Sequence, residues 1–187
     1  MSKNNRSDTF VANLKDFRKP KIIAITGMLL ALYLVVYSLN IQISPVIEFR
    51  FGYLVLCLAG FTGGPLMGLA VGLLGDIISM IILAGKSSLP FFFGFTLSYA
   101  VLGLGAGFIF FNSHLNTIRI GLASLLEFIV SITLNTLWLS ILRGTSFKVE
   151  LLIRLPKSSI MLFINAIILY VFMNSIAVAL KKVIYST

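Results

Sequence analysis

Residues 61–76, F-T-G-G-P-L-M-G-L-A-V-G-L-L-G-D, join two long apolar runs and decide how this chain folds. Pro65 and the turn around it prevent a single continuous helix, because proline removes a backbone N–H and clashes with the preceding turn. Glycine also recurs at every fourth position, at residues 60, 64, 68 and 72. Small residues at this spacing allow helix backbones to approach closely. The stretch therefore predicts two helices, joined by a tight turn, within a closely packed bundle.

The composition on either side of this stretch is that of a membrane protein. Of the 187 residues, 58% are hydrophobic and 11% are charged, whereas about a quarter of the residues of a soluble domain are charged. Six apolar segments are present: Ile22–Leu39, Phe51–Thr62, Pro65–Leu83, Phe91–Phe111, Ile118–Leu142 and Ile160–Lys181. Lipid requires backbone groups to be satisfied within each segment, so we expect an all-α protein with six transmembrane helices in a compact bundle. The second segment is short and is expected to tilt or to extend at its outer end.

The amino-terminal residues 1–21 differ from the rest in charge. They contain six cations against Asp8 and Asp16. The apolar run that follows is too long for a cleaved signal peptide. We expect 1–21 to be a basic cytoplasmic segment, either resting on anionic lipid or solvated, and 22–187 to be the transmembrane substrate-binding domain.

The distribution of charge predicts the topology. With both termini in the cytoplasm, nine cations lie inside and six outside, in agreement with the positive-inside rule. The six outer cations are Arg50, Lys86, Arg143, Lys148, Arg154 and Lys157. Only Glu48 and Glu150 oppose them. The outer face is thus either an ordinary solvated surface or an electropositive vestibule for carboxylates or phosphates.

Polar and aromatic side chains are arranged along two of the segments. In the fifth segment, the spacing i, i+4, i+8, i+11 is predicted to place four residues on one helix face: Glu127, Ser131, Asn135 and Trp138. A polar stripe of this kind should face the bundle interior. In the fourth segment, Phe92, Thr96 and Tyr99 share a face in the same way. Aromatic residues near a membrane boundary are interfacial anchors, core residues or ligand contacts, and the first two are commoner. Together with the outer cations they suit a flat heteroaromatic ligand with an acidic end.

The sequence carries no signature of catalysis. It has one histidine, His114, and one cysteine, Cys57, and it contains no nucleophile–base constellation and no metal-ligand cluster. A phosphate-binding loop ending at Gly85-Lys86-Ser87 would need glycine where Met80 stands. We therefore expect no catalytic residue, metal, cofactor or nucleic-acid partner.

Two carboxylates, Asp76 and Glu127, lie well inside predicted spans. Intramembrane carboxylates are candidates for a functional role. Each could relay protons, bind the amino-pyrimidine edge of a substrate, or be held by neighbouring hydroxyl groups. We favour the structural tie for Glu127 and leave Asp76 open.

Several of these stretches resemble one family of transport proteins. Residues 61–76 are similar to the glycine-rich junction between the second and third helices of the substrate-binding (S) components of energy-coupling factor (ECF) vitamin transporters. G-F-T-L-S at 94–98, L-N-T-L-W-L-S at 134–140 and R-L-P-K at 154–157 resemble the folate-specific members. The resemblance covers roughly residues 27–170.

The resemblance implies a six-helix substrate-capture subunit of the bacterial cell membrane. Its ligand would be folate, or a reduced folate, taken up from the outside. Its partners would be a transmembrane coupling protein and two cytoplasmic ATPases, which would drive inward release by reorientation of the bundle.

Chemistry and resemblance together suggest roles for particular residues. Candidates for the folate carboxylates are Arg143, Arg154 and Lys157, and candidates for ring packing are Phe91, Phe95, Tyr99 and Trp138. Asn135 and Thr96 would bond the pterin edge, and Arg50 is a possible lid contact. The family docks on its coupling protein through a small-residue patch, typically Ala-x-x-x-Ala, of the first helix. Gly27 and Ala31 occupy the matching positions.

Two other functions remain open. One is an S component for a different vitamin or precursor, such as thiamine, riboflavin or a queuosine precursor; cationic thiamine suits the basic outer face poorly. The other is an autonomous proton-coupled transporter of small molecules that uses Asp76 and Glu127.

Overall fold

The protein is a bundle of long helices, seen here in a computed structural model that describes residues 19–39, 41–42, 48–49, 51–83, 91–111 and 113–177. The helices are α2 (Pro20–Ser38), α3 (Gly52–Ile82), α4 (Phe93–Phe110), α5 (Thr117–Ile132), α6 (Leu134–Arg143) and α7 (Phe147–Phe172). A π-helical turn, η2 (Met173–Ala177), continues α7. Between α2 and α3, β1 (Ile41–Gln42) pairs antiparallel with β2 (Glu48–Phe49).

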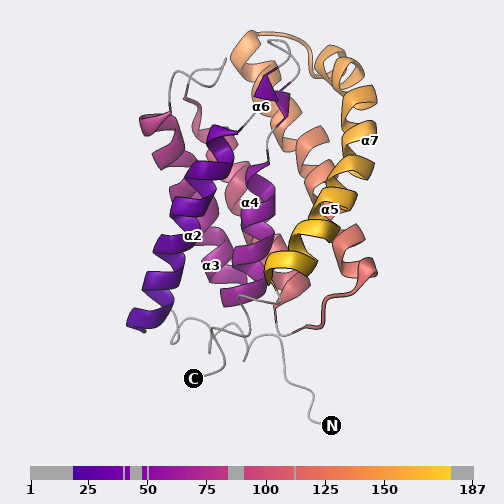
Figure 1. The fold of residues 1–187 in the computed structure, drawn as a ribbon. Helices are drawn as coiled ribbons and strands as arrows, with labels where there is room; N and C mark the ends of the chain where they lie inside the picture. Colours follow the sequence, from indigo (N-terminus) through magenta and orange to yellow (C-terminus); the bar gives the residue numbers. More distant parts are fainter. Residues whose placement is uncertain are drawn as a thin grey trace.

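The all-helical membrane architecture predicted from composition is present in the described residues. Five helical stretches are long and apolar enough to cross a membrane, with α5 and α6 counted as one stretch. In Figure 1 these helices lie side by side, and the start of α2 and the end of α7 lie at the same, lower end of the bundle.

Helix α3 consists of two arms that fold back on each other. The backbone at Gly64 is not helical, with φ 80° and ψ −167°, and Pro65 follows it. The ring of Tyr33 lies against both Gly52 and Gly75, at 2.9 Å and 2.8 Å from where their Cβ atoms would be. In a straight helix these glycines would be about 35 Å apart. The chain therefore reverses at Gly64, where the sequence predicts the turn.

Glycines allow the second arm of α3 to lie directly on α4. A Cβ atom at Gly68 would overlap the backbone carbonyl of Gly103, and one at Gly72 would overlap the carbonyl of Tyr99. Near the turn, a Cβ at Gly60 would be 2.5 Å from the backbone nitrogen of Gly107. Backbone-to-backbone contact of this kind is typical of helices packed in lipid. The glycine spacing of this region thus serves internal packing.

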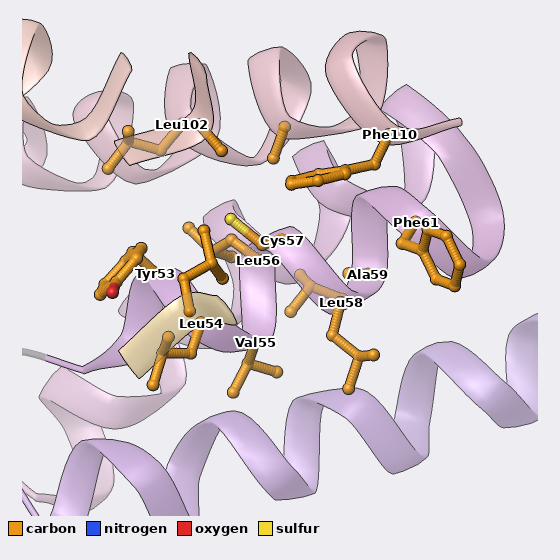
Figure 2. Close-up of a cluster of buried hydrophobic side chains, with 14 of the residues drawn as sticks. Tyr53, Leu54, Val55, Leu56, Cys57, Leu58, Ala59, Phe61, Leu102 and Phe110 are labelled. Atoms are coloured by element: carbon orange, nitrogen blue, oxygen red, sulfur yellow. The ribbon is translucent and has the colours of Figure 1, made fainter. Parts of the chain in front are cut away.

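The first arm of α3 forms the centre of the molecule. Residues 53–59 and Phe61 are all buried, and Figure 2 shows their side chains together with Leu102 and Phe110 of α4. A helix that is apolar on all sides belongs inside a bundle. By contrast, large apolar residues such as Ile23 of α2 and Ile167 of α7 are exposed, as expected for side chains that face lipid.

The predicted start of the last helix, Ile160, is wrong, because α7 begins at Phe147. Pro156 lies inside this helix. Proline and three cations lower the apolar character of residues 147–159, which is why hydropathy placed them in a connector. Along α7 the buried residues are Glu150, Ser158, Met161, Asn165 and Leu169. Their spacing places them on one face of α7, which points into the bundle. This face includes residues of the segment 147–159, which hydropathy assigned to a connector.

The fifth predicted segment is divided at Thr133, where ψ is −75° between α5 and α6. The hydroxyl of Thr136 donates to the carbonyl of Ser131, five residues earlier, over 3.2 Å. This wider turn shifts the helical register. The buried positions of α6 are Thr136, Leu139 and Ser140. Glu127, Ser131, Asn135 and Trp138 are all half-buried, but they belong to two helices rather than to one.

Candidate functional site

Trp138 of α6 packs onto the first turns of α4. Its indole N–H donates to the hydroxyl of Ser98 over 3.1 Å. Its ring centroid lies 5.9 Å from that of Phe92, which in turn lies 6.0 Å from the ring of Phe95. The indole fits because residue 94 is glycine: a Cβ there would be 2.5 Å from Trp138 Cδ2. Phe92, Phe95 and Trp138 thus form one aromatic cluster, which we call the Trp138 cluster.

The other aromatic candidates lie apart from this cluster. Phe91 is 56% exposed, whereas Phe95 is buried. Tyr99 is buried, with its ring edge-on to Tyr33 of α2 at 6.2 Å.

Thr96, predicted as a pterin contact, is buried against α3. Its hydroxyl donates to Asp76 Oδ2 over 2.7 Å. The hydroxyl proton is therefore already used within the protein. Asp76 is also buried, and this hydrogen bond ties α3 to α4.

The outer cations fall into two groups. Arg143, at the end of α6, forms an ion pair with Glu150 of α7, with Nη1 to Oε1 at 3.3 Å. The hydroxyl of Thr145 donates to the same carboxylate over 3.0 Å. Lys148, on the same helix as Glu150, is exposed. Arg143 thus holds the α6–α7 connection.

Arg154 and Lys157 lie on the bundle side of α7. Both are half-buried, three residues apart, in line with the buried stripe of that helix. Arg154 Nη1 is shielded from solvent. The charges of both residues act on the Glu127 carboxylate of α5 across the bundle. Two cations are therefore held on an interior surface.

A polar network below these cations involves two residues that the sequence did not single out, Asn165 and Tyr53. The amide of Asn165 donates to Glu127 Oε2 over 3.0 Å, and the hydroxyl of Tyr53 donates to the backbone carbonyl of Asn165 over 2.8 Å. Asn165 is an amide inside the apolar segment 160–181, and a polar side chain within a predicted span is the signal by which it could have been found. The Oδ1 atom of Asn135 is also buried and has no hydrogen-bond partner among the described residues.

Three further candidates are placed as follows. Gly27 and Ala31 are exposed on α2, and a Cβ at Gly27 would meet nothing within 4 Å in the described part of the chain. Their shared surface therefore points away from the bundle. Arg50 lies outside the described residues.

The side chains described above are of the kinds that ligand sites use. They comprise an aromatic cluster on α4 and α6, two half-buried cations on α7, and a carboxylate–amide pair between α5 and α7. Rings stack on rings, and cations pair with carboxylates or phosphates. The site therefore suits an aromatic ligand with an anionic end.

Comparison with known families identifies a substrate-binding subunit of a membrane transporter. The chain matches the family model described as "ECF transporter, substrate-specific component" over residues 21–173, and it belongs to that family. The family predicted from the glycine-rich stretch 61–76 is thereby confirmed. Members of this family are transporter components and are not catalytic.

Particular relatives are folate transporters. The chain is 37% identical over 133 residues to "Folate transporter FolT" from Clostridium novyi (strain NT), covering 71% of this chain and 75% of that protein. Among solved structures it is similar to "Crystal structure of FolT bound with folic acid". That match has a TM-score of 0.74 and 25% sequence identity, and it covers 84% of this chain and 95% of the other.

Proposed function

We propose that this chain is the substrate-capture subunit of an ATP-driven ECF importer and that it binds folate, or a reduced folate, from outside the cell. It delivers the ligand inward by reorientation when it is docked on a transmembrane coupling protein and two cytoplasmic ATPases. Support comes from membership of the S-component family and from similarity to FolT, including a FolT structure that contains folic acid.

The observation that carries the ligand assignment is the position of Arg154 and Lys157. Both lie on the bundle side of α7, at the end of the molecule that also holds the Trp138 cluster. Folate combines fused and benzoyl rings with two carboxylates, so it matches both features. We assign the carboxylates to Arg154 and Lys157 and ring packing to Trp138, Phe91 and Phe95.

The remaining candidates receive smaller roles. Asn135 offers a buried amide oxygen, which suits a hydrogen bond from the ligand. Arg143, Thr96 and Tyr99 have partners within the protein, so we expect them to shape the site. Arg50 remains a proposed lid contact.

The proposed topology has six membrane passes with both termini in the cytoplasm. The reversal of α3 at Gly64 supplies the sixth pass, because its two arms run in opposite directions. The charge balance of nine inner against six outer cations supports this orientation.

The direct test is equilibrium binding of folic acid to the purified chain. We expect one folate per chain, with affinity reduced by roughly 1.5–3 kcal/mol in Arg154→Ala or Lys157→Ala, because each loses a charge-assisted bond. Lys148→Ala is the matched control, since Lys148 is an exposed cation on the same helix. Unchanged affinity in both test variants would refute the carboxylate clamp.

A further inference from the structure

Two buried polar side chains, one on α5 and one on α7, lack a hydrogen bond within the described residues. The amide oxygen of Asn165 and the hydroxyl of Ser124 are both buried and have no hydrogen-bond partner among the described residues. Asn165 is 1% exposed. Buried polar groups are normally paired, so each such exception calls for a cause.

The geometry of Asn165 shows what kind of partner is missing. A carboxylate only accepts hydrogen bonds, so the amide must present its NH2 group to Glu127 and its oxygen elsewhere. The hydroxyl of Tyr53 holds the backbone of Asn165 in place over 2.8 Å. Glu127 accepts this bond through Oε2. Asn165 Oδ1 is thus a buried acceptor that lacks a donor among the described residues.

The two cations of α7 attract the Glu127 carboxylate and offset part of the cost of burying it. Arg154 and Lys157 both act on Glu127 across the bundle. A buried charge persists only where other charges or hydrogen bonds compensate it. Glu127 is therefore suited to accept strong, charge-assisted hydrogen bonds.

Asn165 lies further along α7 than Arg154 and Lys157, the proposed carboxylate clamp. Asn165 follows Lys157 by eight residues, which is about 12 Å along a helix. A ligand that spans this distance would have an acidic end at Arg154 and Lys157 and a hydrogen-bond-donating end at Glu127 and Asn165.

We infer that Glu127 and Asn165 form a second subsite that binds the adjacent N–H donors of a 2-amino-4-oxo heterocycle, such as the pterin ring of folate. This inference rests on the proposed function. The exocyclic amine and the neighbouring ring N–H lie side by side and donate in parallel, in the fork geometry that a carboxylate accepts. Asn165 Oδ1 accepts a further N–H. The subsite gives the buried Asn165 Oδ1 the donor that it lacks among the described residues.

The test compares two ligands in the purified full chain: folic acid and its analogue in which a methyl group replaces the 2-amino group. We expect the wild type to prefer folic acid by roughly 10- to 100-fold, because the analogue loses a hydrogen bond to a charged group. In Glu127→Gln this preference should fall to within a few-fold, while the analogue still binds and so reports an intact fold. Asp76→Asn, which neutralises the other intramembrane carboxylate, should keep the wild-type preference.

The outcomes separate the two proposals. If the wild type binds neither compound, the proposed function fails. If it binds folic acid but does not discriminate, or if Glu127→Gln weakens both compounds by the same factor, only the subsite is overturned. Should Glu127→Gln fail to fold, Glu127→Asp provides the same comparison, because it retains the charge but moves the carboxylate back by one methylene. The preference of Glu127→Asp for folic acid over the analogue should also fall.

Discussion

At the level of single residues, the position of Trp138 depends on two small neighbours on α4. Ser98 accepts the indole N–H, and Gly94 leaves room for the ring. The first and last residues of the motif G-F-T-L-S thus position the indole, while Phe95 belongs to the same aromatic cluster. The two residues that sequence analysis chose from it, Phe95 and Thr96, are buried.

We predict that Gly94→Ala displaces the indole and weakens folate binding by about 1 kcal/mol, the typical contribution of one aromatic contact. Trp138 is the only tryptophan, so intrinsic fluorescence reports on this ring alone, and its emission maximum should shift. Gly121→Ala is the matched control, because a Cβ there meets nothing within 4 Å among the described residues. An unchanged emission spectrum and affinity in Gly94→Ala would contradict this role.

At the level of helices, the pairing of α3 with α4 sets the shape of the bundle. Gly68 and Gly103 bring the two backbones into contact, and Asp76 ties the same pair through Thr96. The hydrophobic effect contributes little to helix association within lipid. Close packing and hydrogen bonds must therefore hold the pair together.

We predict that Gly68→Ala lowers stability by about 1–3 kcal/mol, since its methyl group would overlap the carbonyl of Gly103 and force the helices apart. Thermal unfolding in detergent would measure the change. Gly121→Ala makes the same chemical change at an open helical position and should be neutral or slightly stabilising. Equal melting temperatures in the two variants would show that the α3–α4 contact tolerates expansion.

At the level of the whole molecule, one exposed surface of α2 carries small residues. Gly27 and Ala31 are exposed there, and a Cβ at Gly27 would find open space in the described structure. We propose that this surface docks on the coupling protein of the transporter.

We predict that Gly27→Leu leaves folate binding by the isolated chain unchanged but abolishes ATP-driven uptake by the assembled transporter, because the added side chain separates the docked helices. Binding in detergent and uptake into proteoliposomes containing the complete transporter would be measured in parallel. Gly121→Leu places the same bulk at an exposed glycine of α5 and should retain uptake. Loss of binding in Gly27→Leu would show that residue 27 supports the ligand site instead. Transport by the isolated chain, abolished by Asp76→Asn, would favour an autonomous proton-coupled carrier.

Local features of the sequence were sufficient for the main helices and for the reversal near Pro65. Apolar runs mark the helices because lipid permits few alternatives, and Gly64 with Pro65 supplies a backbone that a helix cannot continue through. The same hydropathy reasoning failed at the start of α7. There, cations and Pro156 occupy a helix whose charged side faces the bundle rather than lipid.

The sequence by itself determined that this protein is an all-helical membrane bundle with a tight turn at Gly64, and it supplied the cations and aromatic rings of the candidate site. These properties depend on interactions between residues near in the chain and on their affinity for lipid or water. Only the tertiary structure decided which side chains meet: Trp138 with Ser98, Thr96 with Asp76, Arg143 with Glu150, and Asn165 with Glu127. Such pairs depend on the rotation and register of helices against one another. A break such as that at Thr133 changes both without altering the apolar pattern.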